Sequence, residues 1–146
     1  MFWRQSGLKN EMIGLDTNVL VRYITQDDPV QSLGATDLME NFSIDAPGFV
    51  AMVAAVELVW VLQSCYHAKR QDIVLVLETI LRSRELIVER AELVWQALRR
   101  FSGSNADFAD CLIERCGHAA ECDYTATFDH TAACGAGMKL IGAIGT

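Results

Sequence analysis

Short apolar runs alternate with longer amphipathic segments along the chain, and this alternation limits the fold more than any other feature. Buried strands are predicted at residues 12–15, 49–50, 86–88, 124–128 and 140–141. Helices are predicted at residues 19–24, 29–42, 54–66, 71–83, 91–101 and 106–121. Strands that alternate with helices favour a parallel sheet covered on both faces. We therefore expect an α/β fold with a central parallel sheet of four to five strands.

Cap residues and apolar positions refine this prediction. Asp16-Thr17-Asn18 is a typical helix start, and Asp28 before Pro29 is another. In the helix predicted at 29–42, the large apolar residues are expected to face inward; these are Val30, Leu33, Leu38 and Phe42.

The length of 146 residues suits one domain. Residues 1–11 have no periodicity and are interpreted as a leader or tag, so residues 12–146 are expected to form the fold. No apolar run reaches the ~20 residues of a membrane helix, and no signal peptide is evident. A soluble, cytoplasmic protein is predicted.

The five cysteines include no CxxC pair, so reduced and mostly buried thiols are favoured over a zinc site. The formal net charge of −7 opposes RNA binding by counterion release alone. An acidic balance is compatible with nucleic acid if carboxylates gather at one site and hold cations.

Two acids follow predicted strands directly. Asp16 comes after the first strand and Asp129 after the run that ends at Phe128. Ligands of open α/β sheets bind beyond the carboxyl ends of the strands, so both acids are expected at one sheet edge. Simple helix caps or turn residues are the alternative interpretation.

Glu57 is the only charged residue between Phe49 and Leu62. Burying a lone carboxylate costs several kcal/mol unless it is paired or bound to a metal. A functional carboxylate is favoured, and a buried salt bridge or a helix that exposes one position is the alternative.

Asp107, Asp110 and Glu114 share one face of the helix predicted at 106–121. Such a face is often merely solvated, but the positive end of the helix dipole suits clustered anions near Asp107 and Asp110. Converging carboxylates need cations, and oxygen ligands favour Mg²⁺ or Mn²⁺. Phosphodiester hydrolysis is the reaction that best fits such a site.

Four motifs in order resemble the PIN domain, and within it the VapC toxins of bacterial toxin–antitoxin pairs. They are MIGLDTNVLVRYI at 12–24, VELVWVL at 56–62, NADFADCLI at 105–113 and TFD at 127–129. The resemblance implies a three-layer α/β/α fold and an endoribonuclease that depends on Mg²⁺ or Mn²⁺. It also implies that the metal ligands are Asp16, Glu57, Asp110 and Asp129, with Asp107 as an additional catalytic acid.

The same resemblance implies a homodimer, an RNA substrate and a cognate VapB-like antitoxin, with no membrane partner. Arg22, Arg99 and Arg100 are candidate contacts to the RNA backbone.

Two other functions compete with this interpretation. A phosphatase of the haloacid dehalogenase type also begins with a strand-borne aspartate. It needs a second Asp where this chain has Asn18, and a lysine for which Lys139 is the only late candidate. A non-catalytic partner-binding domain with an acidic pocket is the other alternative.

Overall fold

The computed structural model describes residues 11–142, and the chain forms two compact units. Unit 1 holds residues 11–69 and 75–89, and unit 2 holds residues 70–74 and 90–142. Each unit is described by itself below. The predicted leader lies outside the described residues except for Glu11, which is exposed.

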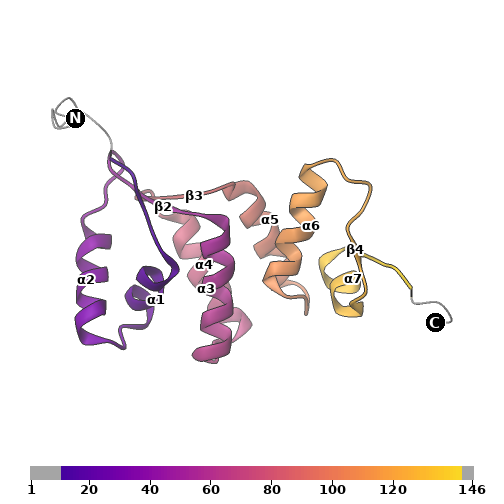
Figure 1. The fold of residues 1–146 in the computed structure, drawn as a ribbon, viewed down its shortest axis with the longest axis horizontal. Coiled ribbons are helices and arrows are strands. Elements are labelled where there is room, and N and C mark those ends of the chain that lie inside the picture. The colour runs from indigo at the N-terminus through magenta and orange to yellow at the C-terminus, as the bar shows by residue number, and fades with distance from the viewer. Residues whose placement is uncertain (1–10, 143–146) are drawn as a thin grey trace. The chain divides into compact units, whose positions relative to one another are not determined.

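Unit 1 is built on a three-stranded parallel sheet in the order β1-β2-β3 (Figure 1). The strands are β1 (Ile13–Gly14), β2 (Gly48–Val50) and β3 (Leu86–Val88), with Ile13, Gly48 and Leu86 in one row. Its helices are α1 (Thr17–Thr25), α2 (Pro29–Glu40) and α3 (Met52–Cys65), together with residues 75–82 of α4 (Arg70–Arg82). The short runs predicted as strands at residues 12–15, 49–50 and 86–88 are confirmed.

Both predicted aspartate caps are confirmed. The Asp16 carboxylate accepts a hydrogen bond from the backbone N–H of Thr17. The Asp28 carboxylate accepts from the N–H groups of Val30 and Gln31, with Pro29 in the first turn of α2. These bonds satisfy amide groups that have no partner within the helix. Helix α2 begins at Pro29 as predicted, and α1 begins two residues before the predicted start at 19.

The prediction that Val30 and Leu33 face inward is wrong. Their side chains are 80% and 72% exposed, whereas Ser32 and Ala35 are buried. The small residues form the buried face of α2, and the large residues one position away therefore point to solvent. Helices α1 and α2 lie side by side in Figure 1.

Unit 2 contains α5 (Ala91–Ser102), α6 (Phe108–Ala119) and α7 (His130–Ala136). Strands β4 (Ala126–Thr127) and β5 (Lys139–Leu140) form a parallel pair, with α7 as the crossover between them. Phe101 and Phe108 are fully buried and meet edge to face, with ring centroids 6.0 Å apart. This aromatic contact joins the end of α5 to the start of α6 and belongs to the core of unit 2.

The predicted α/β class with parallel strands is confirmed, but the strand grouping differs from one sheet of four to five strands. The described strands form a sheet of three and a pair of two. Helix α7 was not predicted, because its seven residues, HTAACGA, carry no large apolar residue that would mark a buried face. On α6, Leu112 is buried with Phe108 and Cys111, whereas Ile113 is 53% exposed.

No helix in residues 11–142 is long and apolar enough to cross a membrane.

Candidate metal centre

Thr17 links the two candidate acids of unit 1. Its hydroxyl donates a hydrogen bond of 2.6 Å to Oε1 of Glu57, and its backbone N–H donates one of 2.8 Å to Oδ1 of Asp16. Thr17 itself is only 7% exposed, so α1 and α3 hold it firmly. One anchored residue therefore orients both carboxylates, although they lie 41 positions apart in the chain.

A cavity of about 510 Å³ opens beside this pair. Its walls come from the start of α1 and from the middle of α3, and they are Asp16, Thr17, Asn18, Val56, Glu57, Trp60 and Val61. The cavity therefore combines carboxylates with an apolar and aromatic wall.

Glu57 is exposed, so the prediction that its carboxylate bears the cost of burial is wrong. Helix α3 turns one face to solvent, and this face also carries Val53 and Trp60, which are 67% and 64% exposed. The sequence could not reveal this, because large apolar residues occupy both faces of α3. Glu57 remains a candidate metal ligand because Thr17 donates a hydrogen bond to it and because it lines the same cavity as Asp16.

In unit 2, Asp107, Asp110 and Asp129 form an electrostatically connected group. Partial burial raises the pKa of Asp110 above its usual value, and the negative charges of Asp107 and Asp129 raise it further. Asp129 caps α7 by accepting from the N–H of Thr131 at 2.9 Å. Asp107 lies at the N-cap position of α6 and makes no side-chain cap bond, so its carboxylate is available.

The sequence-predicted acids are thus divided between the units: Asp16 and Glu57 belong to unit 1, and Asp107, Asp110 and Asp129 belong to unit 2. Across residues 11–142, no group of three or more Asp, Glu, His or Cys side chains is arranged to hold a metal ion. Glu114 is engaged otherwise, since its carboxylate pairs with Arg115 at 2.7 Å.

The residues present fit a hard divalent cation in their chemistry. All the candidate ligands are carboxylates, the donor type that Mg²⁺ and Mn²⁺ prefer. The raised pKa of Asp110 marks a position where negative charges repel one another and where a cation would be stabilised.

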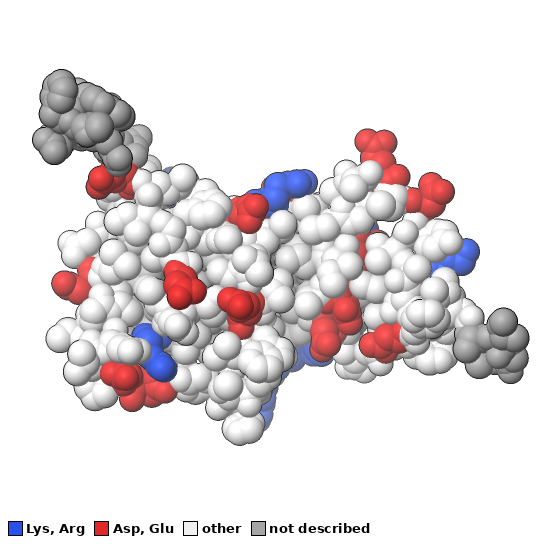
Figure 2. Space-filling view, viewed as in Figure 1, with Lys and Arg blue, Asp and Glu red and all other residues white. Residues whose placement is uncertain are grey.

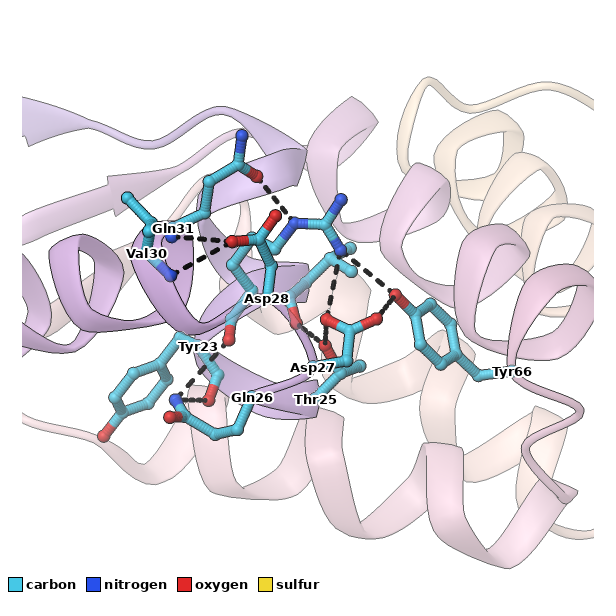
Figure 3. Close-up of polar contacts among 10 residues, drawn as sticks. Tyr23, Thr25, Gln26, Asp27, Asp28, Val30, Gln31 and Tyr66 are labelled. Carbon is cyan, nitrogen blue, oxygen red and sulfur yellow. Dashed lines mark hydrogen bonds and ion pairs between the residues drawn. The ribbon is translucent and has the colours of Figure 1, made fainter.

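Basic side chains are few on the face drawn in Figure 2, and acidic ones are spread widely over it. Arg22, a predicted RNA contact, is engaged within the protein: it donates to Gln31 (2.7 Å), Asp27 (3.2 Å) and Tyr66 (3.2 Å), three partners that are labelled in Figure 3. Arg100 donates to the carbonyl of Ala136 at 2.6 Å.

Arg99 and Arg100 line a pocket of about 380 Å³ in unit 2 together with Arg115. Gln96 and Gly103 complete its wall. Three guanidinium groups thus meet around one hollow in a chain of net charge −7, and one of them, Arg115, is paired with Glu114.

Arg70 is a positioning residue that the sequence did not reveal. Its Nη1 donates to the carbonyls of Phe101 (2.8 Å) and Ala106 (3.0 Å), and its guanidinium stacks 4.0 Å above the Phe101 ring. It thereby fastens the loop that leads to Asp107. A lone arginine after a loop has no sequence signature for this role.

The cysteines are less buried than predicted. Cys65, Cys122 and Cys134 are exposed, Cys116 is half-buried and Cys111 is buried, and none forms a disulfide. The prediction that the cysteines are mostly buried is therefore wrong.

Residues 13–133 match the PIN domain family. The chain is also 31% identical over 100 residues to a VapC ribonuclease of Aquifex aeolicus (strain VF5), which covers 67% of this chain and 73% of that protein. The match includes Asp16, Glu57, Asp107, Asp110 and Asp129 within its range. On this evidence the chain belongs to the PIN domain family.

Proposed function

We propose that this protein is a metal-dependent endoribonuclease that hydrolyses RNA phosphodiester bonds as the toxin of a toxin–antitoxin system. The observation that carries the proposal is the pair of carboxylates, Asp16 and Glu57, that Thr17 holds in a PIN-family chain. The similarity to a VapC ribonuclease supports both the reaction and the biological role.

The proposed metal ligands are Asp16 in unit 1, assisted by Glu57, and Asp110 in unit 2, assisted by Asp129; the assisting acids act directly or through water. Asp107 adds negative charge beside Asp110. A bound Mg²⁺ or Mn²⁺ supplies charge neutralisation and Lewis-acid activation of the phosphate.

The chain's own groups orient the reactants. Glu57, fixed by Thr17, accepts a hydrogen bond from the attacking water and aligns it with phosphorus. Water adds to phosphorus while the bond from phosphorus to the 3′-oxygen breaks; Glu57 takes the proton that water loses, and the departing 3′-oxygen takes a proton from solvent. The products carry a 5′-phosphate and a 3′-hydroxyl.

A VapB-like antitoxin, a second copy of the chain and RNA are the proposed partners, and the cytoplasm is the proposed location. The exposed Val30 and Leu33 on α2 support a protein partner, because large apolar side chains at the surface favour association.

The test compares Asp16→Asn and Asp110→Asn with the wild type on structured RNA. Both variants keep the side-chain shape and remove the charge, and we expect cleavage to fall about 100-fold or more. Asp45→Asn, which changes an exposed acid in the loop before β2, is the matched control and should cleave at the wild-type rate. Cleavage should require Mg²⁺ or Mn²⁺ and stop with a chelator.

Turnover of p-nitrophenyl phosphate without RNA cleavage would instead favour the phosphatase alternative. Undiminished RNA cleavage by Asp16→Asn would contradict the proposed mechanism.

A further inference from the structure

Trp60 lies beside the candidate acids of unit 1. It follows Glu57 by three residues on α3, so both side chains project from the same side of the helix. Both line the cavity that also holds Asp16. The Trp60 side chain is 64% exposed.

An exposed indole needs a physical explanation here. Leu58, Val59 and Leu62 of the same helix are buried and supply its contacts to the core of unit 1. Trp60 is therefore not needed to close that core. Large aromatic side chains left at the surface beside polar groups commonly mark a binding position.

The negative charge around the cavity disfavours contacts to RNA phosphates and leaves stacking on a base as the available contact. With a net charge of −7 and two carboxylates in the cavity, this surface does not attract phosphates through basic residues. The described lining of the cavity contains no Lys or Arg. Stacking of a base on an aromatic ring does not depend on charge, and it is the usual means of holding unpaired nucleotides.

We propose that Trp60 stacks against an unpaired base of the RNA next to the bond that is cleaved. This inference rests on the proposed function and specifies its substrate: a single-stranded segment or loop. A base in a duplex has both faces covered by its neighbours, so it is not available to the indole. Trp60 is thus a substrate-binding residue that selects unpaired RNA.

The experiment measures binding and cleavage separately. Binding of a mixed-sequence single-stranded RNA of about twelve nucleotides is followed in the Asp110→Asn background, which prevents cleavage and leaves the cavity of unit 1 intact. The same RNA paired with its complement is the duplex probe. Cleavage constants are measured in the otherwise wild-type protein.

Three substitutions distinguish stacking from simple apolar contact. Trp60→Phe keeps an aromatic face and should bind the single strand within about threefold of the parent. Trp60→Ala and Trp60→Leu should weaken single-strand binding about tenfold or more and raise KM, while kcat changes little. Duplex binding should change much less. Val53→Ala, on the same exposed face of α3, is the control and should leave all constants unchanged.

Several outcomes would overturn the inference. If Trp60→Leu binds as well as Trp60→Phe, the contact is apolar and not aromatic. If Trp60→Ala changes the sedimentation mass, this face of α3 is an interface between copies of the chain. If the wild type cleaves RNA and Trp60→Ala does so with unchanged KM, only this inference fails; if the wild type neither binds nor cleaves RNA, the proposed function fails as well.

Discussion

At the scale of single residues, Thr17 orients both candidate acids of unit 1. Its backbone N–H and its hydroxyl are directed at different carboxylates, and its own side chain is buried. A carboxylate held in one orientation loses less conformational entropy on binding a cation or water than a free one does. Thr17 is accordingly a positioning residue for Asp16 and Glu57.

Replacing Thr17 by Val removes the hydroxyl and keeps the shape of the side chain. We expect kcat to fall about tenfold, with KM little changed, because Glu57 loses its orienting hydrogen bond. Thr17→Ser restores the donor and should recover most of the activity. Equal losses in Thr17→Ser and Thr17→Val would show that packing, not the hydrogen bond, is what matters.

Cys111 should be the least reactive thiol of the chain. Burial raises its pKa to about 11, so the thiol is protonated at pH 8 and is shielded from reagents. Iodoacetamide at pH 8 should modify the exposed Cys65, Cys122 and Cys134 and leave Cys111 unmodified until the protein unfolds, as peptide mass spectrometry can measure. Because the folded pKa is raised, this thiol's contribution to stability is present below about pH 9 and is lost as pH rises toward 11. Rapid labelling of Cys111 in the native protein would contradict the prediction that this thiol is the least reactive.

At the scale of elements, a polar cluster ties together the ends of α1, α2 and α3 (Figure 3). The Tyr66 hydroxyl donates to Asp27 at 2.6 Å and accepts from Arg22 at 3.2 Å, and the Thr25 hydroxyl donates to Asp27 at 2.8 Å. The bond from Tyr66, followed by that from Thr25, lowers the pKa of Asp27.

Tyr66→Phe tests this cluster through the pH dependence of stability. The pKa of Asp27 is lowered in the folded state. Its carboxylate therefore contributes to the stability of the fold above the ordinary pKa of 3.8, and this contribution is lost as pH falls through the folded pKa. We expect Tyr66→Phe to lower Tm slightly at pH 7, with a difference that shrinks below pH ~3. The effect is small because the cluster is open to solvent. If the difference in Tm between the wild type and Tyr66→Phe is the same at pH 7 and at low pH, the loss of stability comes from packing and not from the hydrogen bond to Asp27.

Gly137 ends α7 in the left-handed conformation, with φ of 84°. A Cβ at this position would collide with the guanidinium of Arg100, which also binds the carbonyl of Ala136. Gly137→Ala should therefore lower the free energy of unfolding by about 1–2 kcal/mol in urea denaturation. Gly34→Ala is the matched control: Gly34 lies in α2 with open space around it, so the substitution should stabilise by up to about 1 kcal/mol. Equal effects of the two substitutions would contradict this reasoning.

At the scale of the whole molecule, the excess of acidic residues determines how RNA is approached. The net charge of −7 disfavours phosphates, and the hollow lined by Arg99, Arg100 and Arg115 gathers basic side chains. Arg115 is neutralised by Glu114, and Arg100 is partly engaged by Ala136. Arg99 is exposed and is the member of this group best placed to meet an RNA phosphate.

Arg99→Glu should weaken binding of single-stranded RNA several-fold and reduce the dependence of log Kd on log salt concentration. Arg84→Glu makes the same charge change at an exposed position in unit 1 and is the control for net charge. The reasoning is contradicted if both variants weaken binding equally, since net charge alone would then explain the result.

The helix starts at Asp16 and Asp28 and the strand at Leu86–Val88 were predictable because they depend on neighbouring residues. The exposure of Glu57, Val30 and Leu33 was not, because α2 and α3 carry apolar residues on more than one face, and only packing selects the face that is buried. Helix α7 escaped prediction because its small residues leave no periodic signal.

By itself the sequence determined the α/β class, the capping of α1 and α2 and the types of acid available, since these follow from local chemistry and from ordered motifs. Tertiary structure alone decided that Thr17 joins Asp16 to Glu57, that Asp107 and Asp129 raise the pKa of Asp110, and that Arg70 fastens the loop before Asp107. Apart from the neighbouring pairs Asp16–Thr17 and Asp107–Asp110, these relations join residues that are distant along the chain. Their energies depend on distance and burial in space, which no local pattern of residues encodes.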